Sequence, residues 1–313
     1  MLFFPYKADL EQWRFPLVTL LVCAICIIVY SYQYEKQSSI DYEVVSYCNK
    51  AMQNNKFRFS LSHISIVTGL HSDDVCKYML RMSHTSEQPE QVIHEWAYIS
   101  KDKLKYSEQV TRERIKNLFL SAHAEFSLNA SYPLTQNLWF SPEKIDLVKM
   151  VTSSFAHADL EHLFGNILFF FVFAATVELV IGSVSLVVTI VLLAITTNCF
   201  YAFTSFLNAE FIPTMGLSGV VFGMMGLFVC FLPRVGIRCF FWFFIVYRRV
   251  VIPSWILVSS YVGWSMYDWL TLGADSNVNF IVHISGALFG YLIGLTVFRI
   301  SKLQYTTATT ALN

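Results

Sequence analysis

Charged residues are scarce in this chain, and neither sign is in excess. Lys, Arg, Asp and Glu make up 14% of the 313 residues, and the formal net charge is +0. Nucleic-acid binding usually needs a basic surface, so no nucleic-acid partner is expected. Hydrophobic residues reach 55%. Such an apolar chain is too hydrophobic for an ordinary soluble domain and is expected to lie in a lipid bilayer.

Glycine is almost absent from the one polar stretch. Between Gln33 and Lys149 lie 14 of the 22 basic and 14 of the 22 acidic residues, but only one glycine, Gly69. Apolar residues recur there at helical spacing, which predicts a folded helical module and not a flexible linker. The histidines of this stretch lack the close spacing of metal ligands, so neither a metal nor another cofactor is expected.

Six apolar segments predict an all-α polytopic membrane protein with six transmembrane helices. Ile237–Tyr247 is too short to cross a bilayer core of about 30 Å, so the apolar segment around it is expected to lie at the membrane interface. In the last span Gly286, Gly290 and Gly294 form a ridge that allows another helix to approach closely. The six spans are Phe15–Tyr32, the apolar part of Val148–Ile181, Ser183–Phe206, Met215–Leu232, Val250–Trp269 and Asn279–Phe298.

Basic residues in the short loops fix the expected orientation. With the N-terminus in the cytoplasm all of them face the cytoplasm, as the positive-inside rule requires. The predicted parts are therefore a cytoplasmic N-terminus with the first helix (1–32), an extracytoplasmic helical insert (33–147), a core of five helices (148–300) and a cytoplasmic tail (301–313). The basic residues are Lys7, Arg14, Arg234, Arg238, Arg248, Arg249, Arg299 and Lys302.

A serine lies at the entrance of a span that contains no charge. Ser218 stands between Gly216 and Gly219, and small neighbours let a substrate approach the hydroxyl closely. A serine in a membrane helix can also simply bond to the preceding turn of its own helix. Ser218 alone therefore leaves a nucleophile and a structural serine both open.

Polar residues on two other spans favour the nucleophile. His162 and Asn166 share one helix face, His157 precedes them, and His283 lies near the start of the last span. Polar side chains there could be hydrogen-bonding contacts between helices. The predicted orientation instead brings them all to the depth of Ser218 near the outer face. Together they supply a hydroxyl, an imidazole base and oxyanion donors, as serine hydrolysis requires. No acid lies at that depth, so a Ser–His dyad is expected.

Three ordered motifs on three spans resemble the rhomboid family of intramembrane serine proteases. They are His157-Ala-Asp-Leu-Glu-His-Leu-Phe-Gly-Asn166, Gly216-Leu-Ser-Gly219 and His283-Ile-Ser-Gly-Ala-Leu-Phe-Gly290. The resemblance runs from Leu138 to about Phe298 and implies a bacterial-type protein in the inner membrane. It implies an active site that faces the periplasm and substrates that are transmembrane proteins. The oligomeric state is not specified by the sequence.

The resemblance also implies a role for each candidate residue. Ser218 is the expected nucleophile and His283 the general base. The oxyanion is expected to meet His162, Asn166 and the Ser218 N–H, in a site shaped by Gly216. His157 and Phe222 are expected to support the site, the latter by stacking on the catalytic imidazole.

Several positions depart from the family pattern. The Trp-Arg pair of many bacterial members is missing, and the nearest tryptophan is Trp139. The arginine that often follows the equivalent of Glu178 is absent, and Phe222 stands where some relatives have Tyr. The segment from Gln33 to about Tyr132 lies outside the resemblance. None of these differences removes a catalytic group.

Two other functions compete with the protease. An inactive rhomboid-like protein that binds transmembrane clients would usually have lost the serine or the histidine, and both are present. A transporter or channel would carry ionisable groups at mid-depth or on both sides.

The insert contains two cysteines, Cys48 and Cys76. They can pair if the compartment outside is oxidising, and buried free thiols are the alternative.

Overall fold

The computed structural model describes residues 2–8, 15–86, 88–99, 106–243, 246–272 and 278–299. The chain divides into two compact units, one made of Met1–Tyr30 with Leu138–Asn313 and the other of Ser31–Asn137. The predicted tail 301–313 lies outside the described residues. Helix α1 (Leu17–Ala51) contributes its first part to the first unit and its later part to the second.

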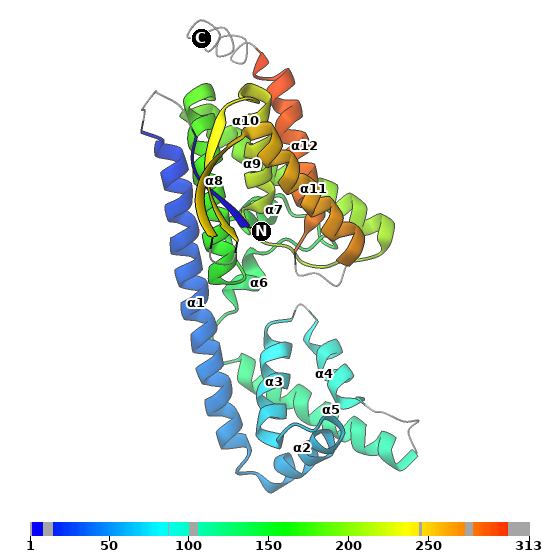
Figure 1. Cartoon of the computed structure of the whole chain (residues 1–313). Helices are drawn as coiled ribbons and strands as arrows, with labels where there is room; N and C mark the ends of the chain where they lie inside the picture. The colour runs from blue at the N-terminus through cyan, green and yellow to red at the C-terminus, as the bar shows by residue number, and fades with distance from the viewer. Residues whose placement is uncertain are drawn as a thin grey trace, which may run out of the picture. The chain divides into compact units, whose positions relative to one another are not determined.

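The first unit is a bundle of apolar helices (Figure 1). Among the described residues, three helices are long and apolar enough to cross a membrane: α1, α8 (Leu160–Ile181) and α9 (Ser183–Asn208). Helices α10 (Ser218–Phe231) and α12 (Phe280–Thr296) are apolar but shorter. The bundle is completed by α11 (Ser254–Leu272), the short helix α7 (Leu147–Thr152) and the 3-10 turn η1 (Ser153–Phe155).

Helix α10 forms the centre of this bundle and packs backbone to backbone against α12. Almost all of its residues are buried. A Cβ atom added to Gly290 would lie 1.9 Å from the Gly223 carbonyl oxygen, and one added to Gly286 would lie 2.3 Å from that of Gly219. The predicted glycine ridge is therefore a helix contact in which any side chain would force the two helices apart.

We expect Gly290→Ala to lower the thermal unfolding temperature of the detergent-solubilised protein clearly. The added methyl group meets backbone and not a side chain that can rotate away, and overpacking of this kind costs about 1–3 kcal/mol or more. Gly263→Ala on α11 is the matched control, since a Cβ there has nothing within 4 Å. This control should be neutral or slightly stabilising, because alanine favours helices. Equal unfolding temperatures for the two variants would contradict the close contact.

Buried Glu178 fixes the start of α1. Its carboxylate accepts hydrogen bonds from the backbone N–H groups of Val18 (3.0 Å) and Thr19 (2.9 Å), from the Thr19 hydroxyl (2.8 Å) and from the Ser183 hydroxyl (2.6 Å). A carboxylate at a helix N-terminus meets unpaired N–H groups and the positive end of the helix dipole. Glu178 thus accepts three of these hydrogen bonds from the start of α1 and one from Ser183 at the start of α9.

A three-stranded antiparallel sheet differs from the prediction. Strands β1 (Leu2–Ala8), β2 (Gly236–Phe243) and β3 (Val246–Pro253) pair in that order. The prediction of an all-α protein is wrong for these residues, and the fifth apolar helix begins at Ser254 and not at Val250. The expected position of Ile237–Tyr247 at the membrane interface stays a prediction. Ile237 and Cys239 are fully buried, whereas Arg238 between them is exposed. This alternation is the period of a strand and places one face on the helical core.

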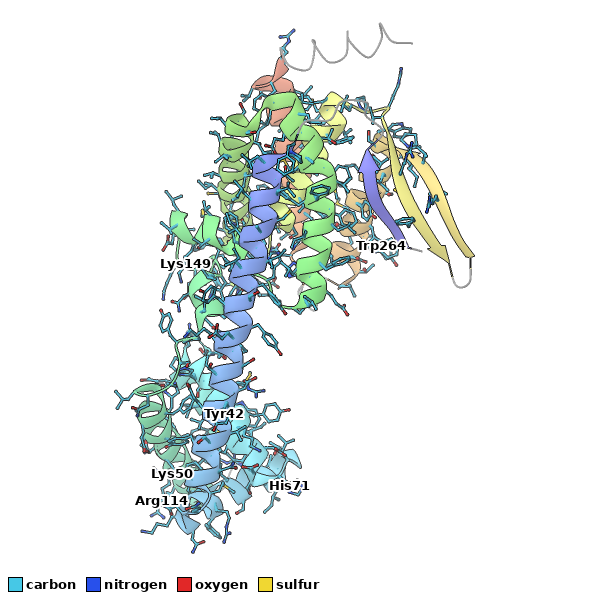
Figure 2. All side chains as sticks on the ribbon, turned by 90° about the vertical axis from the view of Figure 1, so that its left-hand side faces the viewer. Tyr42, Lys50, His71, Arg114, Lys149 and Trp264 are labelled. Carbon is cyan, nitrogen blue, oxygen red and sulfur yellow. A yellow bond between two sulfur atoms is a disulfide. The ribbon has the colours of Figure 1, made fainter. Side chains whose placement is uncertain are left out.

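The second unit has its own hydrophobic core. The later part of α1, around Tyr42 and Lys50, packs with the other helices of this unit (Figure 2). A disulfide joins Cys48 on α1 to Cys76 on α3. The predicted helical character of this stretch is confirmed. Its other helices are α2 (Asn55–Thr68), α3 (Ser72–His84), α4 (Pro89–Ala97) and α5 (Tyr106–Ser127), followed by α6 (Leu134–Leu138) at the unit's end.

Candidate active site

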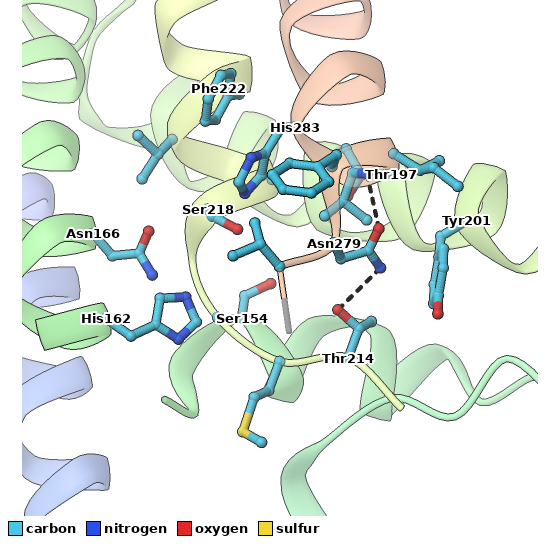
Figure 3. A pocket seen from close by; sticks show the side chains of 18 of the residues that line it. Ser154, His162, Asn166, Thr197, Tyr201, Thr214, Ser218, Phe222, Asn279 and His283 are labelled. Carbon is cyan, nitrogen blue, oxygen red and sulfur yellow. Dashed lines mark hydrogen bonds between the residues drawn. The ribbon is translucent and has the colours of Figure 1, made fainter. Parts of the chain in front are cut away.

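The helix bundle contains a cavity of about 1100 Å³. Six of the seven predicted site residues line it, and they come from α8, α10, α12 and the segment before α10 (Figure 3). His157 is not among the lining residues, although it is almost completely buried. The six that line the cavity are His162, Asn166, Gly216, Ser218, Phe222 and His283.

Ser218 is the first residue of α10. The chain reaches it through Gly216, whose φ of +120° is a conformation that residues with a side chain rarely adopt. The Gly216 N–H donates to the Ser153 carbonyl oxygen at 2.9 Å, which ties this segment to η1. The first N–H groups of a helix have no acceptor inside that helix, so the Ser218 N–H is suited to bind a negatively charged oxygen.

His283 lies in the first turn of α12, beside Ser218 (Figure 3). The Phe222 ring, one turn after Ser218 on α10, stacks on the imidazole with 4.4 Å between centroids and 8° between planes. Within the described part of the chain, no hydrogen bond joins the Ser218 hydroxyl to the His283 ring. Hydrogen bonds between catalytic groups are often long in a free enzyme and shorten when substrate binds.

His162 and Asn166 face the segment before Ser218 from α8. A Cβ atom added to Gly216 would lie 2.7 Å from His162 Nε2 and 3.5 Å from Asn166 Nδ2. Asp159 caps this helix by accepting from the His162 N–H at 2.7 Å. Asn166 Nδ2 is buried and has no hydrogen-bond partner among the described residues. An unsatisfied buried donor beside the serine is a feature that an oxyanion would satisfy.

His157 contacts the site through His162 and does not line the cavity. Its ring packs edge-on against the His162 ring, with 5.2 Å between centroids. Burial and the neighbouring His162 lower the pKa of His157 to about 4. Near neutral pH it is therefore an uncharged ring that supports His162 and adds no positive charge.

The sequence did not identify two contacts that hold the serine segment in place. Thr214 exchanges backbone hydrogen bonds with Phe140, at 2.9 and 2.8 Å. The Asn279 amide donates to the Thr214 hydroxyl at 3.2 Å, and its oxygen accepts from the Val282 N–H at the start of α12 (Figure 3). Asn279 therefore links the segment before Ser218 to the helix that carries His283. The sequence signal for this cap is an Asn directly before the apolar run of the last helix, which is a preferred N-cap residue.

Among the described residues, no group of three or more His, Cys, Asp or Glu could hold a metal ion. What the cavity brings together is a hydroxyl, imidazoles and an amide donor, inside a bundle whose long helices are apolar enough to cross a bilayer. These features define an integral membrane protein with a polar site enclosed by its helices.

Comparison with known proteins identifies the family. A family model described as Rhomboid domain matches residues 144–300. This chain belongs to the rhomboid family, which typically consists of serine proteases and also includes inactive members. No curated protein matches the chain.

Proposed function

We propose that this protein is an intramembrane serine endopeptidase that cleaves transmembrane segments near the outer face of the membrane. Ser218 is the nucleophile and His283 the general base. The observation that carries the proposal is the shared cavity: the serine, the histidine and the unsatisfied Asn166 amide all line it.

The chemistry follows from these groups. The Ser218 oxygen attacks a peptide carbonyl carbon while its proton passes to the His283 ring. The carbonyl oxygen becomes an oxyanion, which Asn166, His162 and the Ser218 N–H stabilise. When the C–N bond breaks, His283 returns the proton to the leaving amine. Water, deprotonated by His283, then hydrolyses the acyl-enzyme and frees Ser218.

The substrate must be unwound where it is cut. A carbonyl inside a helix is hydrogen-bonded and shielded by packing, so residues of low helix propensity near the scissile bond should favour cleavage. The N-terminus of α10, where Ser218 lies, faces the outside in the orientation derived from the basic loops. The same orientation puts Ser31–Asn137 outside the cytoplasm, and its Cys48–Cys76 disulfide suits an oxidising compartment such as a bacterial periplasm.

A serine-directed fluorophosphonate probe tests the assignment. We expect the purified wild-type protein to be labelled, with the label on the peptide that contains Ser218. Ser218→Ala should remove the label, and Ser285→Ala, which changes a buried serine that bonds only within its own helix, should keep it. A folded wild-type protein that neither labels nor cleaves a transmembrane substrate would instead be an inactive member of the family.

A further inference from the structure

The second ring nitrogen of His283 has a partner outside the three sequence motifs. Ser265 lies on α11, and its hydroxyl oxygen is 3.5 Å from His283 Nδ1. Its side chain is buried, with 5% of the residue exposed. Ser265 therefore reaches the imidazole from a helix that supplies none of the predicted site residues.

Apart from Ser218 and Ser265, two aromatic rings contact the imidazole of His283. Phe222 stacks on one face, and the Phe280 ring approaches edge-on at 6.2 Å between centroids. In the described part of the chain, Ser265 is the one group that hydrogen-bonds to this imidazole. Within the described residues, no other hydrogen bond sets the orientation of the His283 ring or decides which of its two nitrogens is protonated.

A general base needs one bare nitrogen and one protonated nitrogen in its neutral form. The nitrogen that takes the Ser218 proton must carry no hydrogen, so the hydrogen of neutral His283 must be on Nδ1. Its donation to the Ser265 oxygen stabilises that tautomer. After the proton has moved, the same bond becomes charge-assisted and stabilises the imidazolium.

We propose that Ser265 is a positioning residue that holds His283 in the tautomer and orientation required of a base. The proposal rests on the proposed protease function. A serine suits this place because a carboxylate, the usual third group, would be a buried charge inside the membrane. The neutral hydroxyl accepts the hydrogen without that cost.

The test measures cleavage of a transmembrane substrate and the rate of fluorophosphonate labelling in three variants of Ser265 and one control variant. We expect Ser265→Ala to lower kcat and the labelling rate about 10-fold, by analogy with the loss of the hydrogen-bonding partner of a metal-ligating histidine. KM should stay near the wild-type value, because Ser265 orients the base and does not bind substrate. Ser265→Thr, which keeps the hydroxyl, should restore most of the rate.

Ser285→Ala is the matched control. Ser285 is equally buried, at 3% exposed, and its hydroxyl bonds only to the Val282 carbonyl oxygen of its own helix. It should keep the wild-type rate. Ser265→Cys provides a second reading, since a thiol of similar size is a weak acceptor and should give an intermediate rate.

The outcomes separate this proposal from the protease itself. A wild-type protein without cleavage or labelling overturns the proposed function. An active wild type with an equally active Ser265→Ala overturns the role of Ser265 alone. A slow Ser265→Ala that Thr does not rescue, or a rise in KM with unchanged kcat, also overturns the positioning role. If Ser265→Ala does not fold, the comparison is between Ser265→Cys and Ser265→Thr. A Cys variant as active as the Thr variant, or one that changes KM and not kcat, overturns the positioning role.

Discussion

His283→Ala should abolish turnover while the protein remains folded. The Ser218 hydroxyl is a weak nucleophile until a base takes its proton, and removal of the histidine from a serine–histidine pair costs about 10⁶-fold in kcat. Of the two other histidines near the site, His162 faces Gly216 and His157 packs behind His162. The substitution removes a ring from beside Phe222 and leaves the glycine contacts between α10 and α12 intact.

The measurement is cleavage of a purified transmembrane substrate in detergent and in liposomes, followed by gel and mass spectrometry. His63→Ala is the control, since His63 lies on α2 in the Ser31–Asn137 unit and should leave the rate unchanged. The thermal unfolding temperature reports whether each variant is folded. Measurable turnover in folded His283→Ala that still depends on Ser218 would show that another group is the base.

The helical core was predictable because each motif opens a span and the basic loops orient all spans together. Ser218, His283 and the pair His162 and Asn166 lie on three separate spans, yet the orientation of the spans predicted that they lie at one depth. The structure places all four around one cavity. The glycine ridge was predictable for a similar reason, because its four-residue repeat is a property of one helix.

Contacts between segments distant in sequence could not be predicted in the same way. The pairing of Leu2–Ala8 with β2 depends on a partner more than two hundred residues away, and no local pattern specifies such a register. Nothing in the sequence distinguishes Ser265 from other serines in apolar spans, and its contact with His283 depends on how α11 packs against α12. The donors of Glu178 likewise became visible only when α1 and α8 were placed together.

The alternation of apolar and polar residues did indicate a strand here. It is missed when the segment is judged only by whether it is long enough to span the membrane as a helix. Buried Ile237 and Cys239 flank exposed Arg238, which is a strand pattern inside a run judged by its overall hydrophobicity. A segment that is too short to span as a helix can still be regular as a strand. In membrane proteins, the period of the hydrophobic pattern and the length of the apolar segment therefore need to be considered together.

Asn166→Ala should lower kcat by about 10²–10³-fold, the usual loss when one oxyanion donor is removed. The Asn166 amide is buried and lacks a partner among the described residues, so its donor is held ready for a charge that appears only during the reaction. For the same reason KM should change little, because a neutral substrate carbonyl gains less from this donor than the oxyanion does. Truncation should not destabilise the fold, since the lost Nδ2 group has no bond to break.

Asn166→Asp sharpens the test, because it keeps the shape of the side chain and replaces the amide donor by a group that accepts hydrogen bonds when ionised. A carboxylate at this place repels the developing oxyanion, so the loss in kcat should exceed that of Asn166→Ala. The rates of both variants are measured at saturating substrate, with fluorophosphonate labelling to count folded sites. If the two variants lose equal activity, or if KM rises while kcat is kept, Asn166 binds substrate or supports the fold and does not stabilise the oxyanion.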